Sequence, residues 1–157
     1  MINLIGTYEA KSDVKGRVLL PAAFKKQLAP VVAEEFVLKR SMFQGCLELY
    51  PMKEWEKVMQ QVGRLNRFNK KNNDFIRKLT SGVKVISVDS NGRILLAKDL
   101  LAFAGISKDV VLSSSISFIE IWDKERYELA VQDDEGALAD LAEEVMGDVK
   151  FDTDGLS

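Results

Sequence analysis

Hydrophobic and polar residues alternate along several short stretches of the chain, while other stretches place hydrophobic residues every three or four positions. Alternation predicts strands, and the wider spacing predicts helices with one apolar face. The expected strands are 5–11, 17–20, 36–38, 46–50, 83–88, 93–96, 110–112 and 118–122. The expected helices are 22–28, 51–65, 74–79, 98–104, 123–131 and 137–146, with an interruption at 66–73.

Prolines and glycines mark where several of these elements begin and end. Pro21 and Pro51 stand at the starts of expected helices, which the fixed φ of proline suits. Gly105 follows the fourth expected helix, where glycine is a common stop. The strands 5–11 and 17–20 flank one short polar loop, so they can pair as a hairpin.

One sequence motif occurs twice and divides the chain into related halves. Asp13-Val14-Lys15-Gly16-Arg17 is followed by three aliphatic residues and a helix start, and the pattern returns 76 positions later at Asp89-Ser90-Asn91-Gly92-Arg93. A chain that matches itself at a fixed period is a duplicated unit. Because one repeat alone is near the size at which a core is marginal, the two repeats are expected to share one core. The expected organisation is repeat 1 at 5–53, a helical insert at 54–80, repeat 2 at 81–128 and an acidic helical tail at 129–157.

The repeated motif has the composition of a tight loop that orients an arginine. Its glycine permits a positive φ, and its aspartate can accept backbone N–H bonds across the turn. The arginine then leaves the loop in a fixed direction just before a strand. One such loop is more often an ordinary turn with a solvated arginine, but two matching copies favour a binding surface. The expected loop-shaping residues are Asp13, Gly16, Asp89 and Gly92.

The composition argues against catalysis and against a membrane span. The chain contains no histidine, which removes Ser-His and Cys-His nucleophiles and histidine-ligated metal sites. Cys46 is the only cysteine and lies in an apolar strand, so we expect a buried structural thiol. No apolar run approaches the roughly 20 residues of a membrane span, and residues 1–6 lack the features of a signal peptide. We therefore expect no enzyme, no catalytic or metal-ligating residue and no cofactor.

Charge is distributed unevenly along the chain. Residues 1–119 hold 19 Lys and Arg against 11 Asp and Glu, whereas residues 120–157 hold 3 against 13. Such an asymmetry indicates a basic body and an acidic tail, although the whole chain has a net charge of −2. The helical insert contributes a cluster of cations that is either a solvated face, a phosphate contact or a subunit seam. These cations are Arg64, Arg67, Lys70, Lys71, Arg77 and Lys78.

The two loops fit recognition of nucleic acid. Arginine binds guanine edges and phosphates in bidentate fashion, and each motif has a second polar or basic residue two places before its arginine. RNA stays open as a partner, because the electrostatic attraction is the same. One protomer offers only two loops, but an oligomer would align several and gain from effective concentration. The residues expected to contact double-stranded DNA are Lys11, Lys15, Arg17, Asn91 and Arg93.

The duplicated D-x-[KN]-G-R motif, with Pro21-Ala22-Ala23-Phe24 after its first copy, resembles the MraZ family of bacterial transcriptional regulators. More broadly it resembles the AbrB-like swapped-hairpin DNA-binding proteins, and the likeness covers about residues 1–130. It implies an α+β, mainly β fold: a tandem duplicated swapped-hairpin (AbrB-like) β-barrel with a helical insert and C-terminal helices. It also implies a cytoplasmic, nucleoid-associated regulator that forms homo-oligomeric rings. Such rings would bind short repeated promoter elements of the division and cell-wall gene cluster, including the protein's own gene.

The chain departs from the family pattern at three positions after the motifs. Lys25 stands where the first copy usually has arginine, while Ala97 and Leu101 stand where the second copy usually has proline and arginine. Counted along the chain, the first copy therefore brings three cations, including Lys25, and the second brings only Arg93. This count predicts that repeat 1 supplies more of the phosphate attraction.

An alternative function is that of an antitoxin-like module. The same barrel type serves as the DNA-binding part of antitoxins whose tails bind a protein, and the acidic tail at 129–157 favours this alternative. A basic protein that copurifies with the chain would support it.

Overall fold

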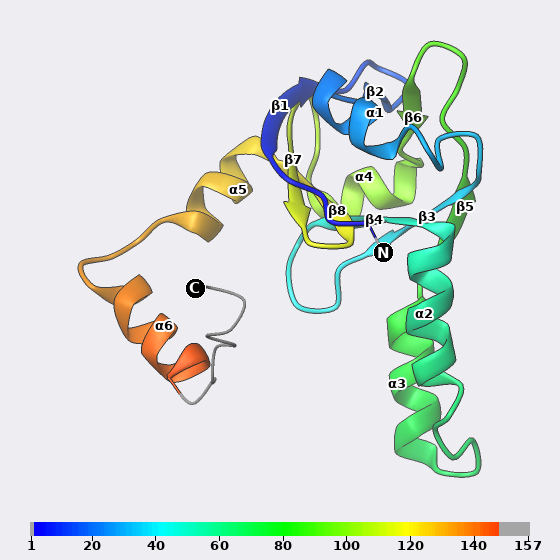
Figure 1. Cartoon of the computed structure of the whole chain (residues 1–157), viewed down its shortest axis with the longest axis vertical. Helices are drawn as coiled ribbons and strands as arrows, with labels where there is room; N and C mark the ends of the chain where they lie inside the picture. The colour runs from blue at the N-terminus through cyan, green and yellow to red at the C-terminus, as the bar shows by residue number, and fades with distance from the viewer. Residues whose placement is uncertain (1, 148–157) are drawn as a thin grey trace, which may run out of the picture. The chain divides into compact units, whose positions relative to one another are not determined.

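The computed structural model describes residues 2–147 and is a mixed α+β fold, as predicted (Figure 1). Every paired strand within this part of the chain is antiparallel to its neighbour. The strands are β1 (Thr7–Lys11), β2 (Arg17–Leu19), β3 (Phe36–Arg40), β4 (Leu47–Pro51), β5 (Lys84–Ile86), β6 (Arg93–Leu95), β7 (Asp109–Ser115) and β8 (Phe118–Asp123). The helices are α1 (Ala22–Leu28), α2 (Met52–Val62), α3 (Lys70–Thr80), α4 (Lys98–Ala104), α5 (Lys124–Val131) and α6 (Ala137–Met146).

Strands of the two repeats interleave in the main sheet. Its order is β1-β7-β8-β4-β3-β5, so the first strand of each repeat pairs with the third strand of the other. At the centre β4 pairs with β8, where Glu48 lies directly opposite Glu120. The remaining strands, β2 and β6, pair only with each other. Exchanging the two repeats leaves this order unchanged, which is the arrangement of a swapped, duplicated unit.

The local hairpin predicted for the first two strands is wrong. β1 pairs along its length with β7, and the pairing toward β2 is limited to one isolated bridge between Ser12, just after β1, and Val18. A closed barrel is not detected among the described residues, whose strands pair as one six-stranded sheet and one two-stranded ribbon. The three-residue strands β2 and β6 pair with each other and not with β1 or β5. The main sheet therefore ends at β1 and β5.

Both repeats contribute to one hydrophobic core. The sheet presents Leu38, Leu49, Leu112 and Ile121 on one face, and α1, α4 and the β2–β6 ribbon pack against that face. Among the fully buried side chains facing the sheet are Val18, Phe24 and Leu28 from repeat 1, and Ile94, Leu96 and Leu100 from repeat 2. Neither repeat could bury these residues without the other, so the prediction of a shared core is confirmed.

The opposite face of the sheet is covered near the helical insert. Val37 and Tyr50 pack with Trp55 of α2, and the Tyr50 and Trp55 rings lie 5.5 Å apart edge to face. Glu48 on the same face forms an ion pair of 3.4 Å with the buried Lys39. The alternation of the strand and the ion pair with Lys39 thus account for the position of the Glu48 carboxylate, and no catalytic role is needed to explain it.

Several local predictions about boundaries require correction. The helix expected at 51–65 already ends at Val62, and the strand expected at 36–38 continues to Arg40. The third helix begins at Lys70 rather than at 74, because the side chain of Asn69 caps it by accepting from the amides of Lys71 and Asn72. β7 extends through Ser115 rather than ending at 112, because it continues as a ladder with β8 in which Ser115 pairs with Phe118.

Cys46 is fully buried, as predicted. Burial raises the pKa of its thiol to about 12, so the thiolate is not formed near neutral pH.

The chain divides into two units, residues 1–127 and residues 128–157. The second unit contains the helix α6, which carries Leu138, Leu141 and Val145 as exposed apolar side chains. The predicted tail runs on to residue 157, but residues 148–157 lie outside the described part of the chain. Across residues 2–147, none of the helices has the length and apolar character needed to cross a membrane.

Candidate nucleic-acid interface

The first motif folds into a loop that is held by one carboxylate. Asp13 Oδ1 accepts hydrogen bonds from the backbone amides of Lys15 and Arg17, both at 2.9 Å. Asp13 Oδ2 accepts a third from the Nε of Arg17 at 2.7 Å. Gly16 has a φ of 88°, a conformation that favours glycine. The loop thus fixes both the backbone and the guanidinium of its arginine.

The second motif repeats this geometry. Asp89 Oδ1 accepts from the amides of Asn91 and Arg93 at 2.9 Å each, and Oδ2 accepts from Arg93 Nε at 3.1 Å. Gly92 has a φ of 77°. In both copies the aspartate therefore accepts the backbone hydrogen bonds across the turn, and the glycine adopts a positive φ.

Hydrogen bonding keeps both loop carboxylates ionised. The backbone N–H of Arg17 is the largest cause that lowers the pKa of Asp13 below its ordinary value of 3.8, and the N–H of Arg93 does the same for the pKa of Asp89. Each arginine uses its Nε toward the aspartate, and within residues 2–147 its two terminal nitrogens have no protein partner. Those terminal nitrogens are available for an external acceptor.

Acid should weaken the hydrogen bonds that Asp13 and Asp89 accept in the two loops, and one substitution should show that the two carboxyl groups titrate independently. The stabilisation by a carboxylate of lowered pKa is present above pH 3.8 and is lost as the pH falls through its lowered value. Carboxyl carbon shifts in an NMR titration should give midpoints below 3.8 for Asp13 and Asp89. Arg17→Ala should raise the Asp13 midpoint only part of the way, because the amide of residue 17 remains. The midpoint of Asp89 should not move, and a change in both midpoints would contradict independent loops.

The two arginines lie on one face of the β2–β6 ribbon. Arg17 is opposite Leu95, and Leu19 is opposite Arg93. Cross-strand partners share a face, so these four side chains point away from the core that Val18 and Ile94 enter. Leu19 and Leu95 are 51% and 52% exposed, as expected for the outer face.

The size of the ribbon suits a groove of DNA. With about 3.4 Å per residue and about 4.8 Å between strands, the two arginine Cα atoms are roughly 8 Å apart. A two-stranded ribbon of this kind fits the major groove of B-DNA, which is about 12 Å wide. Arginine can bind guanine there, and the exposed leucines can contact thymine methyl groups.

Comparison with known proteins identifies the family. The model of the MraZ protein family matches residues 4–78 and again residues 79–148, and the family's description also carries the term antitoxin-like. The chain belongs to the MraZ family. The "Transcriptional regulator MraZ" of Christiangramia forsetii is 60% identical over 152 residues, covering 97% of this chain and 98% of that protein. The protein of the same name from Flavobacterium psychrophilum is 58% identical over 157 residues, covering all of both chains. That from Bacteroides thetaiotaomicron is 40% identical over 149 residues, covering 94% and 95%.

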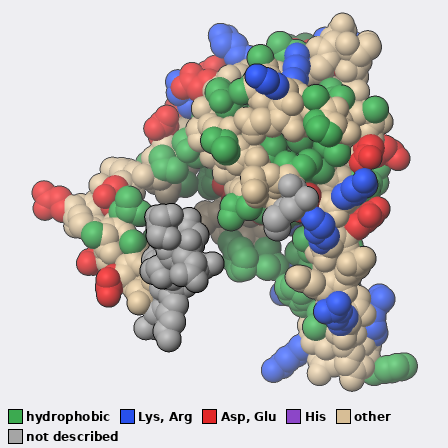
Figure 2. Space-filling view, viewed as in Figure 1, with side chains coloured by type: hydrophobic (Ala, Val, Ile, Leu, Met, Phe, Trp, Pro, Cys, Tyr) green, Lys and Arg blue, Asp and Glu red, His purple; other side chains and the backbone are tan. Residues whose placement is uncertain are grey.

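The helical insert of this MraZ-family chain carries the cations that the sequence placed there. In Figure 2, Lys and Arg side chains gather along the segment of α2 and α3. Arg77 pairs with Asp74 at 2.9 Å, but the two side chains are 74% and 46% exposed, so the pair adds little stability. The insert therefore has a surplus of positive charge at its surface.

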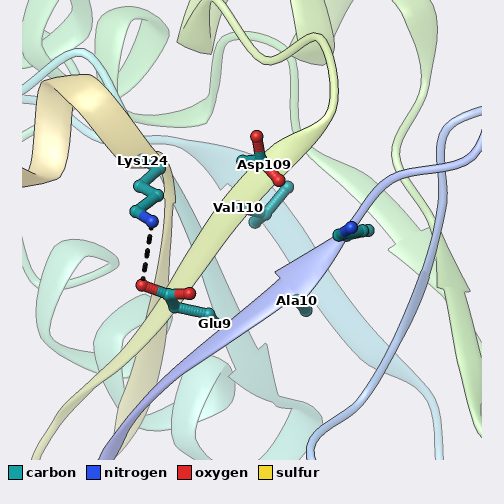
Figure 3. A pocket seen from close by; sticks show the side chains of 6 residues that line it. Glu9, Ala10, Asp109, Val110 and Lys124 are labelled. Atoms are coloured by element: carbon teal, nitrogen blue, oxygen red, sulfur yellow. Dashed lines mark ion pairs between the residues drawn. The ribbon is translucent and has the colours of Figure 1, made fainter.

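The structure places the predicted DNA contacts in two settings. Lys15 and Asn91 are exposed on the two loops beside their arginines. Lys11 instead ends β1 opposite Asp109, and both line a shallow hollow of about 150 Å³. Figure 3 shows Glu9 in this hollow with its ion pair to Lys124, at 3.2 Å. Lys11 thus has carboxylates as neighbours, which reduces the attraction that it can offer to a phosphate.

Sequence reasoning did not single out the leucines of the ribbon. The signal was present in Arg17-Val18-Leu19, because a strand that buries Val18 must turn its two neighbours outward. The described residues contain no cluster of three or more cysteine, aspartate and glutamate side chains suited to a metal ion.

Proposed function

We propose that this protein regulates transcription by binding double-stranded DNA in a sequence-specific manner through the β2–β6 ribbon and its two loops. The observation that carries the proposal is the pair of arginines held by Asp13 and Asp89 on one exposed face. The proposed contacts are Lys15, Arg17, Asn91 and Arg93, with Lys11 at the margin. The relatives that share most of this sequence are named transcriptional regulators, which supports this function. No catalytic activity is proposed.

We further propose that the target is a set of short repeated promoter elements. The family resemblance favours elements of the division and cell-wall gene cluster, including the gene of the protein itself, and thus a cytoplasmic protein at the nucleoid. A ribbon of two three-residue strands touches few bases, so one protomer would bind weakly. A ring of protomers would present several ribbons to neighbouring repeats and gain affinity through effective concentration.

Selection of bound fragments from the source genome tests the proposal. One short repeated element should dominate the bound DNA. Filter binding of that element should then give a slope of at least about −4 in log K against log salt, since each neutralised phosphate contributes about −0.9 and several loops engage. A flat salt response, or fragments without a common element, would refute the proposal.

The helical insert is proposed to form part of the subunit interface. Phe68, between α2 and α3, is fully exposed, and Phe75 on α3 is 38% exposed, which is unusual for large apolar side chains in one small segment. Phe68→Asp should therefore reduce the oligomer size in light scattering coupled to size exclusion, while the melting temperature stays near that of the parent.

Leu138→Asp is the matched control, since Leu138 is also an exposed apolar residue but lies on α6. It should leave the oligomer size unchanged. A parent protein that is monomeric before any substitution would contradict the proposed ring outright.

A further inference from the structure

The side chain of Lys25 lies across the loop of the other repeat. Lys25 belongs to α1 of repeat 1, yet a Cβ added at Gly92 would overlap its Cε and Nζ atoms. The backbone ties the same parts together, because the amide of Leu20, just before α1, donates to the carbonyl of Gly92 at 3.0 Å. The second loop is thus covered by the first repeat's helix.

The reciprocal contact shows that this crossing is a property of the fold. A Cβ added at Gly16 would lie 3.0 Å from Cδ1 of Leu101, a residue of α4 in repeat 2. The amide of Leu96 donates to the carbonyl of Gly16 at 2.8 Å, matching the bond between Leu20 and Gly92. Each loop is therefore completed by the helix of the opposite repeat, at positions 25 and 101.

This crossing changes the distribution of charge between the two loops. Counting by repeat, three cations belong to the first copy and one to the second. Counting by position in space, the first loop has Lys15 and Arg17 beside the apolar Leu101, and the second has Arg93 and Lys25. Each loop then holds two cations against one aspartate.

The ammonium group of Lys25 is free to bind an anion. Across residues 2–147 its Nζ forms no ion pair or hydrogen bond, although the side chain is partly buried. Arg93, which follows Gly92, is also a cation, and the carboxylate of the same loop, Asp89, already accepts three hydrogen bonds. Two cations brought together over one loop favour a ligand with concentrated negative charge, such as a phosphate of the DNA backbone.

We propose that Lys25 binds a DNA phosphate as part of the second loop, in partnership with Arg93 rather than with the arginine of its own repeat. This assignment rests on the proposed DNA-binding function. It implies that the two loops attract the duplex equally, and that Leu101 is the position where the first loop lacks the matching cation.

A double-mutant cycle tests the assignment on a short duplex that carries the selected element. Lys25→Met keeps the aliphatic stem over Gly92 but removes the charge. It should weaken binding roughly five-fold at 0.15 M salt and reduce the salt slope by about 1, as expected for one lost phosphate contact. Combined with Arg93→Ala, the losses should be clearly non-additive, whereas combined with Arg17→Ala they should add. Lys26→Met, the next residue on the same helix and exposed, is the control and should bind like the parent.

A gain-of-function variant makes the test independent of any damage to the fold. Leu101→Lys should tighten binding and increase the salt slope, and its effect should couple to Arg17. Coupling of Lys25 to Arg17 instead of Arg93, or an unchanged salt slope in Lys25→Met, would overturn the assignment while leaving DNA binding intact. A parent that binds no duplex would instead overturn the proposed function itself.

Discussion

Replacing Arg17 and Arg93 together with alanine is expected to abolish most of the discrimination between the selected element and scrambled DNA. Each arginine that binds a base edge in bidentate fashion contributes about 1–3 kcal/mol of discrimination. Both side chains lie on the exposed face of the ribbon, 37% and 31% exposed, so their loss should leave the core intact. Titrations of each variant on both duplexes, with circular dichroism to confirm folding, measure the effect.

The single variants and a matched control sharpen this result. The sequence alone ranks Arg17→Ala as the more damaging change, but Lys25 lies at the second loop, and we expect the two single losses to be of similar size. Arg77→Ala removes an equally charged side chain from α3 and should change affinity for both duplexes equally. A folded double variant that binds like the parent would remove the ribbon from the interface and favour the antitoxin-like, protein-binding alternative.

Phe24→Ala is expected to destabilise the protein by about 3–5 kcal/mol, which is typical of deleting a buried phenylalanine side chain. Phe24 is fully buried on α1, and its ring meets that of Tyr8 edge to face at 5.1 Å. The surrounding side chains come from both repeats, so a cavity there weakens the whole core. Denaturant unfolding followed by circular dichroism measures the loss, and the melting temperature should fall by roughly 10 °C.

Phe43→Ala removes the same side chain from a position that is 82% exposed and lies outside the proposed subunit interface, and it is the control. Its effect on the free energy of unfolding should stay within about 0.5 kcal/mol. Because the repeats share their core, Phe24→Ala should still unfold residues 1–127 in a single transition. Two separate transitions, one for each repeat, would show that the repeats are independent.

Local features of the sequence predicted most elements and both loops correctly. Asp13 and Gly16 act within five consecutive residues, so their composition was sufficient to predict the turn. The helix α6 has the predicted bounds, because its apolar residues recur at helical spacing. The start of α3 was missed because the cap by Asn69 outweighs the polar composition of the residues that follow.

Pairing between distant strands could not be derived from local pattern. Nothing in the alternation of residues 7–11 identifies β7 as their partner rather than β2, and only the family resemblance implied an interleaved arrangement. The same limit affected the charges, since Lys25 is close in sequence to Arg17 but lies over Gly92. Interleaving therefore separates neighbours along the chain from neighbours in space.

The pairing of Thr7–Lys11 with Asp109–Ser115 also constrains how the chain is made. About 100 residues separate these strands, and at 5–20 residues per second a ribosome needs roughly 5–20 s to synthesise the interval. Throughout that time the first strand has no native partner, and the apolar side chains of α1 have no complete sheet to pack against. The nascent first repeat therefore exposes apolar side chains until the second repeat has been synthesised. The slower the translation, the longer this incompletely folded state lasts.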